Sequence, residues 1–248
     1  MNITRYACKY DFIICILTNG TLLTEKIIAE LAQFPISSIR ISLYGLEKYH
    51  DKFVGEKGAF ERSMTSLRML NHALPGLGMA TSVITKNNVD DLMILNKKLK
   101  DDGINHKMTP LIFPTAKGDL FPTTLRIGKE KIIQLIQSGM IEITSSQCSS
   151  GISRLRIAPN GEVNPCEMFR DVSFGNILSQ PFTSIIGSEK RKNWIEYLRK
   201  QPSACACSNC SKRKYCPQCL GIGFSENRNL IDKPITLCSL ADAKVSCA

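Results

Sequence analysis

Apolar residues in the first half of the chain follow two alternating spacings. Short apolar runs, or runs with every second residue apolar, predict strands, and apolar residues every three to four positions predict helices. The strand–helix order predicts an α/β fold with a parallel sheet and right-handed crossovers. The predicted strands span residues 12–17, 38–43, 78–85 and 104–113, and the predicted helices span residues 21–34, 60–74 and 89–100.

The pattern changes in the second half. Residues 111–125 are rich in Pro, Gly and Thr and predict a connector, and residues 129–137 predict a polar-faced helix. Beyond Ser145, cysteines, glycines and turn residues dominate, and helical periodicity is limited to residues 193–198. A segment with so little apolar patterning is usually stabilised by bound metal. We therefore expect a domain boundary near Ile143. The expected domains are residues 1–143 and 144–248.

Composition restricts the class of protein. The chain is 43% hydrophobic and 22% charged, as expected for a globular protein with a core. It has no apolar run of the ~18 residues that a membrane-spanning helix needs. The apolar run at residues 12–17 is too short for a signal peptide. We therefore expect a cytoplasmic protein that does not act with a membrane.

The net charge of +10 has two possible interpretations. Part of it lies in the runs 189–192 (EKRK) and 211–214 (SKRK). Such runs usually form solvated faces, but they can also attract an acidic partner such as a peptide or nucleic acid. No aromatic-interleaved pattern accompanies the charge, so nucleic acid is the weaker option.

Nine of the eleven cysteines lie at or after Cys148. In a reducing compartment, clustered thiols hold metal more often than they form disulfides. A CxxC pair lets two sulfurs converge on one centre, and thiolates suit both iron–sulfur clusters and zinc. The histidines lie elsewhere, and the pairs at 207–210 and 216–219 are closer together than in zinc ribbons. Spacing alone favours iron–sulfur clusters but leaves zinc and redox-active thiols open.

The cysteine-rich segment resembles the SPASM domain, the auxiliary-cluster domain of radical SAM enzymes that modify peptides and proteins. The resemblance implies a loop-rich iron–sulfur domain and favours iron over zinc. The matching segments are CSSGISRLRIAPNGEVNPC (148–166), FGNI (174–177), CSNCSKRKYCPQCLGIGFSENRN (207–229) and Cys238.

The same resemblance implies two auxiliary [4Fe–4S] clusters with interleaved ligands. The first would be held by three thiolates, with a fourth site that is open or filled from elsewhere. The two-residue spacing between Cys216 and Cys219 departs from the commoner three. Cys205 and Cys247 are extra, and we expect both to be free thiols. The implied ligands are Cys148, Cys166 and Cys219 for the first cluster, and Cys207, Cys210, Cys216 and Cys238 for the second.

The first half resembles part of a radical SAM (β/α) barrel, from its third to its sixth βα unit. The similar segments are TNGTLLTEKIIAELAQF, IRISLYG, KGAFERSMTSLRML, TSVITKNNVDDL and PLIFPTAKGDLFPTTLRI. In the family, polar groups at the carboxyl ends of these strands line the S-adenosylmethionine pocket. Asn19, Ser42 and Thr85 are the matching residues here, although each also fits an ordinary turn or strand position.

Two features of complete barrels are missing from the sequence. The CxxxCxxC loop, which holds the cluster that cleaves S-adenosylmethionine, is absent, and so is a GGE-like strand. We therefore expect an N-terminally truncated radical SAM/SPASM protein that does not start the radical reaction alone. Two βα units would precede Met1, and their loss would leave a strand edge unpaired.

The resemblance implies an oxidoreductase or maturase of a peptide or protein substrate in complete relatives. The auxiliary clusters would relay electrons or hold the substrate, and a ferredoxin or flavodoxin would supply the electrons. Two alternatives from other classes stay open. One is a non-catalytic iron–sulfur module for electron transfer or binding, and the other is a zinc-stapled interaction domain.

Overall fold

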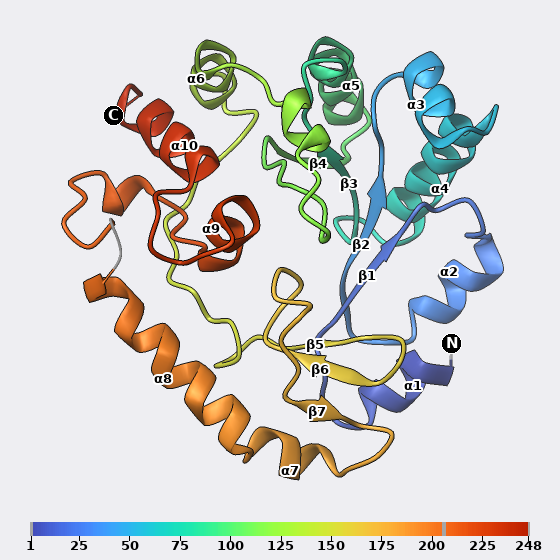
Figure 1. The fold of residues 1–248 in the computed structure, drawn as a ribbon. Helices are drawn as coiled ribbons and strands as arrows, with labels where there is room; N and C mark the ends of the chain where they lie inside the picture. The colour runs from blue at the N-terminus through green and yellow to red at the C-terminus, as the bar shows by residue number, and fades with distance from the viewer. Residues whose placement is uncertain (1, 205–206, 248) are drawn as a thin grey trace. The chain divides into compact units, whose positions relative to one another are not determined.

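The computed structural model describes residues 2–204 and 207–247. The chain divides into two compact units, Met1–Leu111 and Ile112–Ala248 (Figure 1). Among the described residues, no helix is both long and apolar enough to span a membrane.

The first unit is an α/β unit with four parallel strands in the order β1-β2-β3-β4. This arrangement confirms the fold class expected from the sequence, a partial (β/α) barrel. The strands are β1 (Ile14–Thr18), β2 (Ile36–Ser42), β3 (Gly78–Val83) and β4 (Asn105–Thr109), and the helices are α1 (Asn2–Cys8), α2 (Glu25–Leu31), α3 (Glu47–Val54), α4 (Ala59–Ala73) and α5 (Val89–Asp101).

The two faces of this sheet have different surroundings. Ile39, Ile41 and Ala80 are fully buried on one face, and Figure 1 shows α2 and α4 along one side of β1 and β2. From α4, the Ser63 hydroxyl donates to the carbonyl of Asn19 (2.7 Å) and the Ser66 hydroxyl to that of Gly20 (2.6 Å). These bonds fix the loop that follows β1.

A single asparagine connects the loops after β2 and β3. Asn88 is 3% exposed, and its Nδ2 donates to the carbonyls of Tyr44 (2.8 Å) and Val83 (3.1 Å). Its Oδ1 accepts from the backbone N–H of Thr85 (2.7 Å). The carboxyl ends of two neighbouring strands are thus held together by one side chain.

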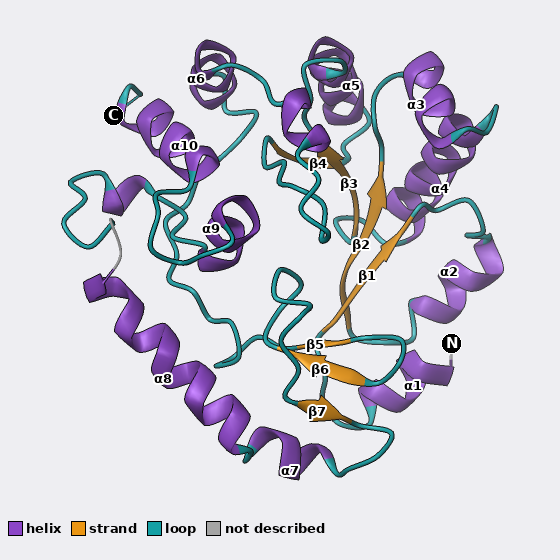
Figure 2. Cartoon of the chain, in the orientation of Figure 1, coloured by secondary structure: helices purple, strands orange, loops and turns teal. Residues whose placement is uncertain are grey.

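The second unit consists largely of short helices joined by long loops (Figure 2). Its small antiparallel sheet has the order β5-β6-β7. The elements are η1 (Phe121–Leu125), α6 (Lys129–Gln137), β5 (Arg156–Ile157), β6 (Glu162–Asn164), β7 (Gly175–Asn176), α7 (Phe182–Ile186), α8 (Glu189–Ala204), η2 (Arg213–Tyr215), α9 (Leu220–Asn227) and α10 (Ile235–Val245).

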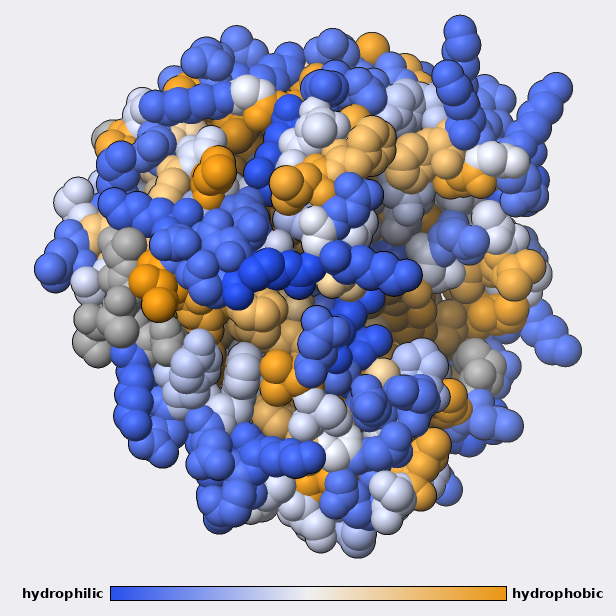
Figure 3. Space-filling view, viewed as in Figure 1, coloured by the Kyte–Doolittle hydropathy of each residue, from blue (hydrophilic) through white to orange (hydrophobic). Residues whose placement is uncertain are grey.

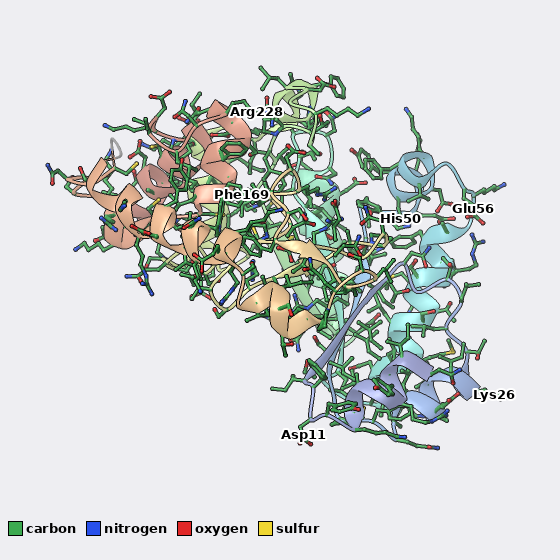
Figure 4. The ribbon with its side chains drawn as sticks, turned by 60° about the horizontal axis from the view of Figure 1, so that its bottom comes forward. Asp11, Lys26, His50, Glu56, Phe169 and Arg228 are labelled. Atoms are coloured by element: carbon green, nitrogen blue, oxygen red, sulfur yellow. The ribbon has the colours of Figure 1, made fainter. Side chains whose placement is uncertain are left out.

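The second unit begins before the domain boundary expected near Ile143. Helix α6 packs on α10, so residues from Ile112 onward belong to this compact unit. Part of its core is aromatic: Phe169, labelled in Figure 4, meets the ring of Trp194 edge to face, with ring centroids 4.7 Å apart. Phe224 packs on the same phenylalanine.

Candidate metal centre

Three cysteines from distant parts of the second unit form the first group. Burial raises the pKa of the Cys219 thiol, and the charges of Cys148 and Cys166 raise it further. Cys166 is 6% exposed within an apolar cluster. The other buried members of that cluster are Phe169, Leu198 and Leu230, and Cys148 packs against them.

The β5–β6 hairpin positions Cys166. Two residues before this cysteine, the fully buried Asn164 donates through Nδ2 to the carbonyls of Arg170 (3.2 Å) and Val172 (3.0 Å). Its Oδ1 accepts from Nη1 of Arg156 at 2.6 Å. The amide therefore ties the strand before the cysteine to the loop after it.

Helix α8 positions the loop that carries Cys148. The Arg191 guanidinium donates to the carbonyls of Gly151 (2.8 Å) and Ile152 (3.1 Å), and the Trp194 indole donates to that of Ser150 (3.3 Å). Gly151 has φ +71°, and an added Cβ would lie 2.6 Å from the Trp194 ring. The EKRK run is thus not wholly a solvated face, because Arg191 supports the cysteine loop.

A second group contains Cys210, Cys216 and Cys238. Burial raises the pKa of the Cys216 and Cys238 thiols. The charge of Cys210 raises both further, and Cys216 also raises the pKa of Cys238. The hydrogen bond and charge of Asp242 raise the pKa of Lys212, and the charges of Cys210 and Cys238 add to the effect. The three thiols therefore lie near one another and near a cation.

Turns and a helix start arrange the segment from Cys207 to Cys219. The N–H of Cys210 donates to the Cys207 carbonyl (3.3 Å), and the N–H of Gln218 donates to the Cys216 sulfur (3.4 Å). Cys219 is the N-cap of α9, and the backbone N–H groups of Ile222 and Gly221 lower its thiol pKa. N–H groups thus point at the sulfurs, as thiolate ligands of clusters require.

The cysteines surround a cavity of about 840 Å³ in the second unit. No disulfide joins any of the cysteines that the structure describes. In the same part of the chain, no three Cys, His, Asp or Glu side chains are grouped as ligands for a single metal ion. Thiolates of a multi-iron cluster bind different iron atoms, so thiols spread around a cavity fit such a cluster. The cysteines lining the cavity are Cys148, Cys207, Cys210, Cys216, Cys219 and Cys238.

The predicted S-adenosylmethionine residues all lie at the carboxyl ends of strands. Asn19 follows β1, Ser42 ends β2, and Thr85 lies two residues after β3. Asn19 is exposed, and its Oδ1 accepts from the N–H (3.2 Å) and hydroxyl (3.1 Å) of Thr21. The Thr85 hydroxyl accepts from the N–H of Asn87 (3.3 Å). The parallel sheet places all three at one edge, and their role with the cofactor stays a prediction.

Comparison with known proteins identifies the cysteine-rich segment. The model of the SPASM family, an iron–sulfur cluster-binding domain, matches residues 148–211. AlbA, the antilisterial bacteriocin subtilosin biosynthesis protein of Bacillus subtilis (strain 168), is 26% identical over 91% of this chain and 54% of its own length. Mycofactocin maturase MftC of Mycolicibacterium smegmatis is 25% identical over 85% of this chain and 59% of its own length. The cysteine-rich segment therefore belongs to the SPASM family of iron–sulfur cluster-binding domains.

Solved structures share the fold of this chain over nearly its whole length. SuiB of Streptococcus suis bound to the precursor peptide SuiA has a TM-score of 0.70 at 14% identity, covering 96% of this chain and 61% of SuiB. Native anSMEcpe with bound AdoMet has a TM-score of 0.62 at 15% identity, and the match covers 95% of this chain and 71% of anSMEcpe. The chain thus spans little more than half of AlbA and about three fifths of SuiB.

Reasoning from the sequence missed the residues that support the SPASM cysteines. The N–H of Gln218 donates to the Cys216 sulfur. Asn164 and Arg191 instead bond to loop carbonyls three to six residues from Cys166 and Cys148. Asn164 and Gln218 lie within two residues of a cysteine, and this closeness in the sequence could have indicated their supporting role. Cys205, one of the two extra thiols, lies outside the described residues. Cys247 is half-buried, with its sulfur 3.9 Å from the Ile133 carbonyl.

Proposed function

We propose that this chain binds two auxiliary [4Fe–4S] clusters in its second unit. One observation carries the proposal: six of the seven cysteines line a single cavity, and the seventh, Cys166, lies near Cys148 and Cys219. This arrangement supports the ligand sets that the family resemblance implies, in which Cys207 joins Cys210, Cys216 and Cys238. The proposed ligands are Cys148, Cys166 and Cys219 for the first cluster, and Cys207, Cys210, Cys216 and Cys238 for the second.

The proposed reaction is the modification of a peptide or protein by S-adenosylmethionine radical chemistry. The names of AlbA and SuiA indicate peptide products or substrates for relatives, and AdoMet is bound in anSMEcpe. In this chain Asn19, Ser42 and Thr85 would contact the cofactor. A ferredoxin or flavodoxin would donate electrons. The bound clusters would supply electron transfer or a substrate-binding iron.

Iron and acid-labile sulfide analysis tests the cluster proposal. The protein, purified anaerobically and reconstituted with iron and sulfide, should bind two clusters' worth of both elements. Cys210→Ala should lose about one cluster and keep the other, because the second cluster loses one of its four thiolate ligands whereas the ligands of the first are unchanged. Cys247→Ala is the matched control and should keep both.

Two results would contradict the proposal. Zinc at full occupancy without labile sulfide would identify a zinc-stapled domain instead. Unchanged iron after Cys210→Ala would exclude that residue as a ligand. Limited proteolysis provides a second measurement, because metal binding is coupled to folding in loop-rich domains and the cluster-depleted variant should be cut faster.

A further inference from the structure

The parallel sheet contains one arginine and one lysine, and the two lie on the same face. The four strands contain no Asp or Glu, and their only Arg and Lys are Arg40 on β2 and Lys107 on β4. Ser42 pairs with Thr81, which pairs with Lys107. Side-by-side residues of parallel strands point to the same face, and so do residues two apart on one strand. Arg40, two residues before Ser42, therefore shares the face of Lys107.

This face is opposite to the hydrophobic core of the unit. Ile41 and Ala80 pair with each other on the other face and are fully buried. On the Arg40 face, Ser42 and Thr81 are half-buried and Lys107 is exposed. The row of Ser42, Thr81 and Lys107 is therefore polar and accessible at Lys107, whereas Arg40 lies between the apolar Leu17 and Met79.

The side chain of Arg40 contains a buried hydrogen-bond donor without an acceptor among the described residues. Its Nε is buried and has no hydrogen-bond partner in the described part of the chain. Among residues 2–204 and 207–247, neither Arg40 nor Lys107 forms an ion pair. A buried donor without an acceptor is costly, more so on a charged group. An anionic ligand would remove that cost.

The spacing of the two cations suits one small anion between them. Arg40 and Lys107 are two strands and one residue pair apart, so their Cα atoms are roughly 12 Å from each other by standard sheet spacings. Both side chains are long enough to converge across that distance. The planar fork of Arg binds a carboxylate through two hydrogen bonds. Ser42 and Thr81 lie in the same row as Lys107.

We propose that Arg40 and Lys107 form a binding site for a carboxylate of the peptide substrate, either an acidic side chain or the chain terminus. The assignment to a peptide rests on the proposed function. S-adenosylmethionine also has a carboxylate, but its sulfonium and ammonium groups leave it with a net positive charge. Two cations without an acidic neighbour on their strands disfavour a cationic ligand and favour an acidic one.

Nuclear magnetic resonance of the full chain tests the site directly. The Nε–H signal of Arg40, identified by its loss in Arg40→Lys, is followed while glutarate is added. We expect a saturable shift with glutarate and none with its uncharged diamide, glutaramide. Lys107→Gln should weaken glutarate binding about tenfold, the loss expected for one charge-assisted contact. Lys26→Gln, which removes an exposed cation on α2, should bind as the parent does.

Three results would overturn the proposal. The Arg40 signal could show no saturable shift with glutarate, or it could shift equally with glutaramide. Alternatively, Lys107→Gln could bind glutarate as tightly as the parent does. Competition by S-adenosylmethionine would assign the carboxylate site to the cofactor and overturn the peptide assignment. Matched peptides that differ only in one glutamate or glutamine complete the test, and the glutamate peptide should bind about tenfold more tightly. The site does not need iron. A protein that binds glutarate but takes up no iron and sulfide on reconstitution would therefore contradict the cluster proposal and leave the carboxylate site standing.

Discussion

A buried histidine in the first unit illustrates how one residue sets a pH response. The Ser82 hydroxyl donates to the Leu43 carbonyl (2.6 Å) and lies 2.8 Å from Nε2 of His106. Because the hydroxyl has only one proton, Nε2 of the neutral ring is its donor. The other nitrogen, Nδ1, is buried without a partner among the described residues. Burial lowers the pKa of His106 to about 4.

This shift predicts that the first unit loses stability as the pH falls from about 6.5 to 4. In that range the unfolded chain binds a proton that the folded chain excludes, so stability rises with pH. A shift from the usual value of about 6.5 corresponds to roughly 3 kcal/mol at most. His106→Gln should reduce the slope. Burial also lowers the pKa of His50, so part of the slope should remain.

Hydrogen exchange of peptides from β3 and β4 measures this effect, after correction for the intrinsic rate at each pH. Protection in the parent protein should decrease between neutral pH and pH 5 more than in His106→Gln. An identical decrease in both proteins would show that His106 is protonated as easily in the folded state as in the unfolded state.

At the scale of elements, an ion pair joins three segments of the second unit. The Arg126 guanidinium contacts Glu226 of α9 at 2.5 Å and donates to the Ile112 carbonyl at 2.8 Å. Glu226 also accepts from the hydroxyl and N–H of Thr236 in α10. Its side chain is 6% exposed. Removing one partner of such a pair leaves a buried charge uncompensated.

We therefore expect Glu226→Gln to lower the free energy of unfolding by about 3 kcal/mol. The matched control is Glu189→Gln, which breaks the exposed pair with Lys192 and should cost less than about 1 kcal/mol. Urea denaturation of reconstituted protein, followed by the fluorescence of Trp194, measures both. Equal effects of the two substitutions would contradict a structural role for the Arg126 pair.

Elements with strong apolar periodicity could be predicted from sequence, and elements without it could not. Helix α6 has the predicted bounds of residues 129–137, because its apolar face is regular. The predicted strand at 104–113 ends earlier, at Thr109, since Pro110 has no N–H to donate. Helix α2 begins at Glu25 rather than at residue 21, because the Thr24 side chain caps it.

The helices after residue 145 were the main misses, because their apolar residues show little helical periodicity. Helix α8 (Glu189–Ala204) is predicted only at residues 193–198, since charged residues fill most of its sequence. Its stability comes from tertiary contacts such as those of Arg191 and Trp194, which no local pattern encodes. Hydrophilic residues also cover much of the face in Figure 3. The sequence therefore indicates where cysteines and strands lie but not which polar residues support them.

At the scale of the whole molecule, the two units differ in how their sites could be predicted. The strand-end residues of the first unit follow from the α/β pattern, because parallel strands end at one edge. The cysteine groups of the second unit follow only from family resemblance. They join residues as distant as Cys148 and Cys219, and spacing cannot fix such pairs without the folded loops between them.

The last prediction concerns S-adenosylmethionine cleavage by this chain alone. Reductive cleavage needs an iron with one free coordination site that the amine and carboxylate of the cofactor can chelate. Three closely spaced thiolates at the barrel mouth create that iron in the family. The 248 residues contain no CxxxCxxC motif, and before Cys148 they contain only Cys8 and Cys15.

We therefore expect reduced, reconstituted protein to form no 5′-deoxyadenosine above a cluster-free control. Chromatography of quenched reactions measures the product, and iron analysis of the same sample verifies that both auxiliary clusters are present. Product at multiple turnovers would mean that an auxiliary cluster performs the cleavage. The first cluster would then be responsible, because three thiolates leave one of its irons with an open site. Cys148→Ala should in that case abolish the activity, whereas Cys247→Ala should keep it.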